Sequence, residues 1–367
     1  MRLIDLGWAT AFTLGLTITP LILPTNSTTR ILLPAASAQS TASQVAEANR
    51  FINQGDQQFA ASQYQAAIQS YQQALRISRE IGDRTIEANL LLNLGYSCYL
   101  LSQYAQSIDY SRQALSIFQA LDDRTGEAKA LNNLGIAYDL LGQYQQAIEY
   151  YQQALPIYKA VGDRNGEGGS LTNLGAAYGS LGQYQREIEY YQQALPIFRA
   201  VDNRDGEATV LGNLGAAYLP LSQYQRAIDY SQQALPIYRE VGNRNGEAKS
   251  LTNLGAAYSS LGQYQQSIEY YQQALPIFRS VGDRNTEGLL LANIGRLYAA
   301  NNSPQSAIQQ LKLSVEVREV IRAELRQLPQ ASQQAYTDSI ADDYRFLAEL
   351  LKQQNRNQEA QAILNLL

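Results

Sequence analysis

Hydrophobic residues along this chain recur at the spacing of an α-helix, in two runs separated by short polar breaks. Leu134 and Tyr138 follow Leu131 by three and seven residues, which puts all three side chains on one face of a helix. A second run at helical spacing lies between Gly142 and Gly162, and glycine commonly ends helices. The pattern therefore predicts two amphipathic helices, called helix A and helix B, joined by a short turn.

The two-helix pattern returns every 40 residues, so the repeat itself is predicted to be the fold. Within one copy, Gly135 and Ala147 are small enough to let the two helices approach closely. The triplet at 133–135, Asn-Leu-Gly, recurs at 93–95, 173–175, 213–215 and 253–255, and as Asn-Ile-Gly at 293–295. We predict an array over 44–323, with repeats at 44–83, 84–123, 124–163, 164–203, 204–243, 244–283 and 284–323, and a degenerate repeat or capping helices at 330–367.

The pattern Leu-x2-Leu-Gly-x2-Tyr at 131–138, followed by Ala-x3-Tyr at 147–151, resembles the tetratricopeptide repeat. Its 40-residue period resembles the long repeats of kinesin light chains and Pins-type scaffolds. The resemblance implies an all-α fold, a right-handed α-solenoid of about seven helix-turn-helix repeats plus a degenerate C-terminal one. It also implies that helices A line a concave groove. The expected function is that of a protein-protein interaction scaffold, which binds a peptide segment of a partner protein in this groove.

Local signals refine the helix boundaries. Gly162 is expected to end helix B, and Asp163 is expected to cap the next helix A. A proline inside a straight helix costs about 3 kcal/mol, so we expect a kink wherever helix B contains one. The alternative is a helix that stops and restarts with proline at its first position. These prolines are Pro156, Pro196, Pro236 and Pro276.

The composition of the chain mainly excludes classes of function. Charged residues make up 17% of the chain and the formal net charge is −5, so no basic face is expected that could neutralise the phosphates of a nucleic acid. The chain has no histidine and one cysteine, Cys98, which falls at a core position. A disulfide within the chain, a zinc site and His-dependent catalysis are therefore excluded. We predict no enzymatic activity and no catalytic, cofactor-binding or metal-binding residue.

The first 38 residues do not belong to the repeat. An apolar run at 6–23 is followed by Ala36-x-Ala38, the arrangement that signal peptidase accepts. We predict an export signal, residues 1–38, that is cleaved after Ala38 and leaves a periplasmic or extracellular protein without membrane insertion. An uncleaved membrane anchor is the main alternative, because about 18 apolar residues is the short end of what spans a bilayer. A disordered cytosolic leader is the other alternative.

The closing segment of the chain resembles the stretch that leads into a caspase-like CHAT protease domain in cyanobacterial tetratricopeptide proteins. That protease family uses a Cys-His pair, and this chain has no histidine, so no catalytic residue can be carried over. An alternative function is therefore a regulatory or docking subunit for a separately encoded CHAT-like protease.

In tetratricopeptide proteins, ligand peptides lie against helix A positions equivalent to Lys129, Asn132, Asn133 and Asp139, so the resemblance implies a peptide site there. An asparagine offers one acceptor and two donors, which can hold a peptide backbone without demanding a sequence. The alternative is that these asparagines bond within or between helices and fix the stacking of the repeats. The predicted peptide-binding residues are Asn93, Lys129, Asn132, Asn133, Asp139, Asn173, Asn213, Lys249, Asn253, Asn293 and Arg296.

Overall fold

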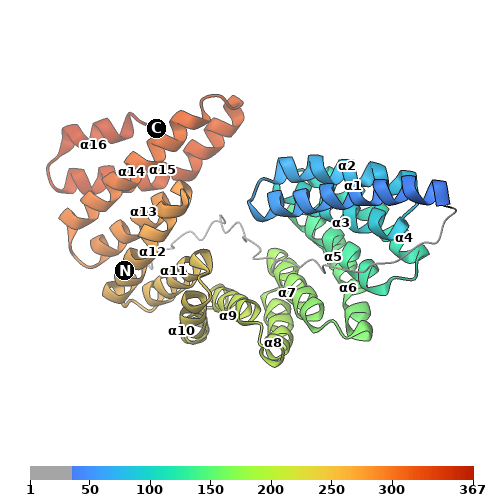
Figure 1. Ribbon diagram of the computed structural model, residues 1–367. Helices are drawn as coiled ribbons and strands as arrows, with labels where there is room; N and C mark the ends of the chain where they lie inside the picture. Colours follow the sequence, from blue (N-terminus) through green and yellow to red (C-terminus); the bar gives the residue numbers. More distant parts are fainter. Residues whose placement is uncertain (1–34) are drawn as a thin grey trace. The chain divides into compact units, whose positions relative to one another are not determined.

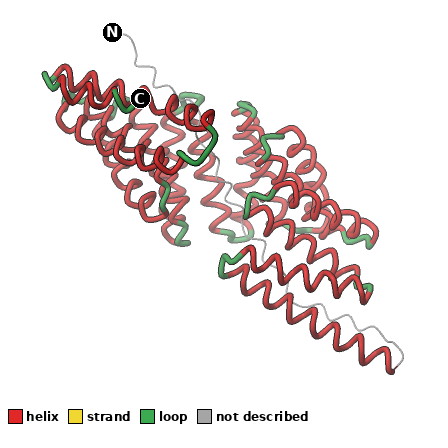
Figure 2. The backbone as a smooth tube through the Cα atoms, turned by 90° about the horizontal axis from the view of Figure 1, so that it is seen from above, coloured by secondary structure: helices red, strands yellow, loops and turns green. Residues whose placement is uncertain are grey.

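The computed structural model of the protein describes residues 35–367, so nearly all of the predicted export signal lies outside the described residues. Every regular element in this range is an α-helix, and consecutive helices form pairs joined by short turns (Figure 1, Figure 2). None of the helices in this range combines the length and the apolar content that crossing a bilayer requires. The prediction of an all-α fold of tandem helix pairs is confirmed.

The chain divides after Gly206 into two compact units. In unit 1 the odd-numbered helices are helices A and the even-numbered helices are helices B, and each pair packs against the next. The helices of unit 1 are α1 (Ala35–Ala60), α2 (Tyr64–Ile81), α3 (Arg84–Leu100), α4 (Tyr104–Ala120), α5 (Arg124–Leu140), α6 (Tyr144–Val161), α7 (Arg164–Ser180) and α8 (Tyr184–Ala200).

Unit 2 continues the same alternation of helices A and B. Its last two helices form the C-terminal pair that the sequence places after the seventh repeat. The helices are α9 (Arg204–Tyr218), which lies mostly in unit 2, α10 (Tyr224–Glu240), α11 (Arg244–Ser260), α12 (Tyr264–Val281), α13 (Arg284–Ala300), α14 (Pro304–Leu325), α15 (Gln330–Gln353) and α16 (Asn357–Leu364).

The turns between repeats have the predicted chemistry. Gly162 ends α6 in the left-handed conformation, with φ of 74°, which costs glycine little because it has no Cβ. Asp163 caps α7, since its Oδ1 accepts a hydrogen bond from the Gly166 N–H at 2.9 Å. The same cap is made by Asp83, Asp123, Asn243 and Asp283.

Small residues of helix A make room for a large side chain of helix B. A Cβ added to Gly135 would lie 2.4 Å from the ring of Tyr151, so only glycine fits there. Tyr151 and Ala147 are fully buried, and Cys98 is 1% exposed, which confirms all three as core residues. The close approach predicted for this helix pair is therefore present.

Helix B continues through its proline. α6 runs unbroken past Pro156, and α8, α10 and α12 do the same at the equivalent prolines. The alternative of a helix that stops and restarts is therefore wrong. Pro156 and Gln152 are exposed, so water can bond the Gln152 carbonyl that loses its helical partner.

Candidate functional site

Helix A has one half-exposed stripe, which we call the A face. In α5 the stripe contains Lys129, Asn132 and Asn133, whereas Leu131 and Leu134 point into the core. On the other helices A the A face consists of the positions equivalent to these three, 40 residues apart in sequence, and their exposure differs from repeat to repeat. The A face therefore carries the asparagines and lysines that the sequence nominates for peptide binding.

The six asparagines of the A face fall into two groups. Asn173 and Asn253 are buried, with 8% and 4% of their surface exposed. The other four are half-buried: Asn93, Asn133, Asn213 and Asn293. Identical residues at one register thus have different access to a ligand.

The two buried asparagines tie one helix A to the helix A before it. Asn173 Nδ2 donates to Asn132 Oδ1 at 3.2 Å, and Ser170 Oγ donates to the same oxygen at 3.5 Å, which connects α7 to α5. Asn253 Nδ2 donates to the Gly212 carbonyl at 3.3 Å, which connects α11 to α9. These contacts favour the stacking role for Asn132, Asn173 and Asn253.

The residue 41 positions earlier differs between Asn173, Asn253 and Asn133. Asn173 finds an amide at Asn132, and Asn253 reaches a carbonyl that Gly212 leaves uncovered. The residue 41 positions before Asn133 is Leu92, which offers no polar side-chain group. Asn133 therefore keeps an open carboxamide.

Among the described residues, no other side chain bonds the carboxamides of the half-buried asparagines. Unit 1 presents two of them, on α3 and α5, and unit 2 presents two more, on α9 and α13. Each retains the donors and the acceptor that a peptide backbone can use.

Asp139 and Arg296 are placed differently from the asparagines. Asp139 is 8% exposed, and burial raises its pKa to about 6. Arg296 donates from Nε and Nη2 to Asp343 Oδ1 of α15 at 2.9 and 2.7 Å, and its guanidinium lies 4.7 Å from the centre of the Phe346 ring. Both side chains thus contribute to packing between helices.

The two lysines of the A face are each half-buried, Lys129 on α5 in unit 1 and Lys249 on α11 in unit 2. Burial lowers the pKa of Lys249, and the nearby Asp283 carboxylate partly opposes that change. Lys129 thus lies one turn before the open Asn133, whereas Lys249 lies one turn before the bonded Asn253.

Sequence reasoning missed an aromatic cluster beside Asn93. The ring of Tyr96, three residues along α3, lies 5.4 Å from Tyr99 and 5.6 Å from Phe59 of α1. Tyr96 is half-buried and so presents part of its ring. The sequence signal for this cluster is the spacing of Asn93, Tyr96 and Tyr99, since positions three apart share a helix face.

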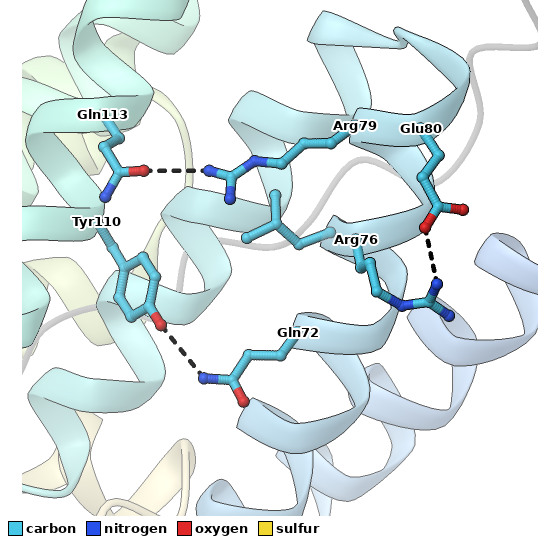
Figure 3. A pocket seen from close by; sticks show the side chains of 7 residues that line it. Gln72, Arg76, Arg79, Glu80, Tyr110 and Gln113 are labelled. Carbon is cyan, nitrogen blue, oxygen red and sulfur yellow. Dashed lines mark hydrogen bonds and ion pairs between the residues drawn. The ribbon is translucent and has the colours of Figure 1, made fainter.

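A second surface lies on the helix B side of unit 1, where α2 and α4 border a groove of about 600 Å³ (Figure 3). Two hydrogen bonds bridge it, from Gln72 to the Tyr110 hydroxyl at 3.2 Å and from Arg79 to Gln113 at 3.1 Å. Arg76 pairs with Glu80 of its own helix at 2.7 Å. Because its polar groups already bond one another, this groove is a weaker candidate than the A face.

A tetratricopeptide repeat family model matches residues 44–120, 86–160, 166–240 and 246–319, which together make up well over half of the chain. A search of curated proteins gives no significant match.

Several solved structures share the fold. Aspartyl phosphate phosphatase F from Bacillus subtilis is 18% identical, with a TM-score of 0.60 over 77% of this chain and 73% of that one. A Rap protein complexed with Competence and Sporulation Factor is 16% identical, with a TM-score of 0.57 over 79% and 80%. The Rap conjugation gene regulator of plasmid pLS20, in complex with the Phr* peptide, is 18% identical, with a TM-score of 0.55 over 80% and 79%. At these identities the likeness concerns the fold alone.

Proposed function

The chain belongs to the tetratricopeptide repeat family, and on that basis we propose that it is a non-enzymatic scaffold that binds a peptide segment of a partner protein on the A face. The observation that carries the proposal is the set of open carboxamides, two in each unit. A peptide backbone presents alternating N–H and C=O groups, and an asparagine can satisfy both kinds.

The surroundings of these asparagines suit a peptide. In unit 1, Tyr96 adds an aromatic surface next to Asn93, and Lys129 adds a positive charge one turn before Asn133. Amide groups can hold the backbone while the ring and the ammonium select side chains. Two of the similar folds, the Rap proteins described above, are in complexes with a named factor or peptide.

We also propose that the protein acts outside the cytoplasm, after cleavage behind Ala38. The apolar run and the Ala36-x-Ala38 site support this location. N-terminal sequencing of protein purified from its source should give Gln39 as the first residue. An intact Met1 end in the membrane fraction would show an anchor instead.

Partner binding can be tested by affinity capture with the array, followed by titration of the identified partner segment. The double variant Asn93→Ala, Asn133→Ala should weaken binding about tenfold, since each lost hydrogen bond costs about 0.5 to 1.5 kcal/mol. A matched control is the double variant Gln145→Ala, Gln146→Ala, which removes two exposed amides from α6, a helix B. Equal affinities of the two variants, both folded by circular dichroism, would move the site away from the A face of unit 1.

A further inference from the structure

Two neighbouring repeats of unit 1 each bury a carboxyl group beside a buried tyrosine. In the α5–α6 pair, Asp139 Oδ1 and the Tyr151 hydroxyl are both buried, and neither has a hydrogen-bond partner among the described residues. In the α7–α8 pair, Glu187 is 6% exposed and Tyr191 is fully buried. Burying a carboxylate without a cation is costly, so this arrangement calls for an explanation.

The carboxyl groups come from opposite helices but fill corresponding sites. In the α5–α6 pair, helix A supplies the acid, Asp139, and helix B has the small Ala147. Forty residues later helix A has Gly179 and helix B has Glu187, and a Cβ on Gly179 would lie 2.5 Å from the Glu187 carboxyl group. Helix A loses its acidic side chain where helix B gains one, so each of these two repeats has one acid at this place.

The groups around these acids do not neutralise them. The titratable side chains that face Asp139 are Tyr99 of α3 and Tyr151 of α6. Glu187 is faced by Tyr191 of its own helix, whose hydrogen bond only partly offsets the effect of burial. Within the described part of the chain, neither acid forms an ion pair with a lysine or arginine.

We propose that α5 to α8 form an acid-stabilised element, which is packed tightly while Asp139 and Glu187 are protonated and opens more readily once they ionise. A protonated carboxyl group is neutral and can donate a hydrogen bond, for instance to a tyrosine hydroxyl oxygen. An ionised one can only accept, and it must give up its hydration to stay buried.

The direction of the pH dependence follows from the pKa values. Burial raises the pKa of Asp139 from 3.8 to about 6 and that of Glu187 from 4.5 to about 8. In the unfolded chain the two acids ionise at their ordinary, lower pKa values. The stabilisation of the folded state is therefore complete below those pKa values and is lost as the pH rises toward the higher pKa values of the folded state. The element is therefore weakened between about pH 4 and pH 8.

The element carries part of the A face. The bond between Asn132 and Asn173 joins α5 to α7 inside it, and Asn133 lies on α5. Opening of these helices disturbs the surface on which the proposed partner lies. The inference about stability holds whether or not that partner exists, because it concerns only packing.

Unit 2 provides an internal control, since its repeats have no acid at the two positions. They hold Leu219 with Ala227, Ser259 with Ser267, and Ala299 with Ala307. None of these side chains titrates in the range considered. The pH effect should thus be confined to α5–α8 and absent from α11–α12.

Amide hydrogen exchange of the full chain tests this. Exchange rates are measured at pH 5 and pH 8 and corrected for the intrinsic exchange rate. The equilibrium constant for local opening of α5–α8 should be about tenfold larger at pH 8 from the ionisation of Asp139 alone, whereas that of α11–α12 should not change. The variant Asp139→Asn, Glu187→Gln should lose that difference. The control Glu149→Gln, Glu189→Gln removes two exposed acids from α6 and α8 and should keep it.

Two results would overturn the proposal. One is a variant that retains the pH difference of the parent. The other is an equal increase in α11–α12 of the parent protein, which needs no variant and so remains decisive if Asp139→Asn, Glu187→Gln does not fold.

Discussion

The α5–α6 pair of unit 1 and the α11–α12 pair of unit 2 share one register but differ in charge at one buried site. In α11–α12, Ser267 is fully buried and its hydroxyl donates to the Gly255 carbonyl at 2.6 Å, so the site is neutral and satisfied. In α5–α6 the site holds Asp139, an acid with an unpaired oxygen. The repeat framework thus tolerates very different chemistry between its helices, and this difference gives the two units different responses to pH.

The framework itself should respond alike in both units, and breaking it should have the largest effect. Leu134 and Leu254 are fully buried at equivalent positions, so Leu134→Ala and Leu254→Ala should each cost about 2 to 5 kcal/mol of unfolding free energy. Urea unfolding followed by circular dichroism measures this. Leu141→Ala, at a residue 44% exposed, is the control and should change stability by less than about 0.5 kcal/mol. A buried variant that unfolds like the parent would contradict the assigned core.

A transplant should carry the pH response from one unit to the other. Ser259→Asp with Ser267→Ala rebuilds the α5–α6 arrangement in α11–α12. The free energy of local opening of α11–α12 should be about 1.4 kcal/mol lower at pH 8 than at pH 5, which corresponds to one pKa unit. Hydrogen exchange reads this out, and Ser259→Asn with Ser267→Ala is the neutral control. If the aspartate and asparagine variants behave alike at both pH values, burial at this position does not produce the pH response.

The smallest expected effect separates the two groups of asparagines. Asn173→Ala removes the bond to Asn132 and should cost about 0.5 to 1.5 kcal/mol of stability. Asn133→Ala removes no such bond and should leave stability unchanged within about 0.5 kcal/mol. Thermal unfolding of the two single variants measures both. Equal losses of stability would show that Asn133 is as structural as Asn173.

Much of the fold follows from sequence because it depends on local patterns. The 40-residue period, the Asp163 cap and the core positions of Leu134 and Tyr151 all follow from spacing and residue type, and the structure contains each of them. The continuity of α6 through Pro156 is less evident from spacing, because proline is compatible with either a break or a continuing helix there.

The site is harder to predict, because contacts between repeats decide it. Asn133 and Asn173 have the same register and the same flanking Leu-Gly, yet only Asn173 has an asparagine 41 positions earlier. Asp139 likewise lies next to the A face in sequence, but it is only 8% exposed and lies near Tyr151 of α6. The sequence shows which residues occupy the helix, and the neighbouring helices determine which of them reach solvent.

The measurement that tests the central claim most directly is a hydrogen-exchange footprint of the identified partner segment on the full chain. The account predicts slower exchange on helices A, first of all in α3 and α5 around Asn93 and Asn133, with helices B unchanged. Protection confined to α2 and α4, around the groove of Arg79 and Gln113, or to α15 and α16, would contradict a peptide site on the A face.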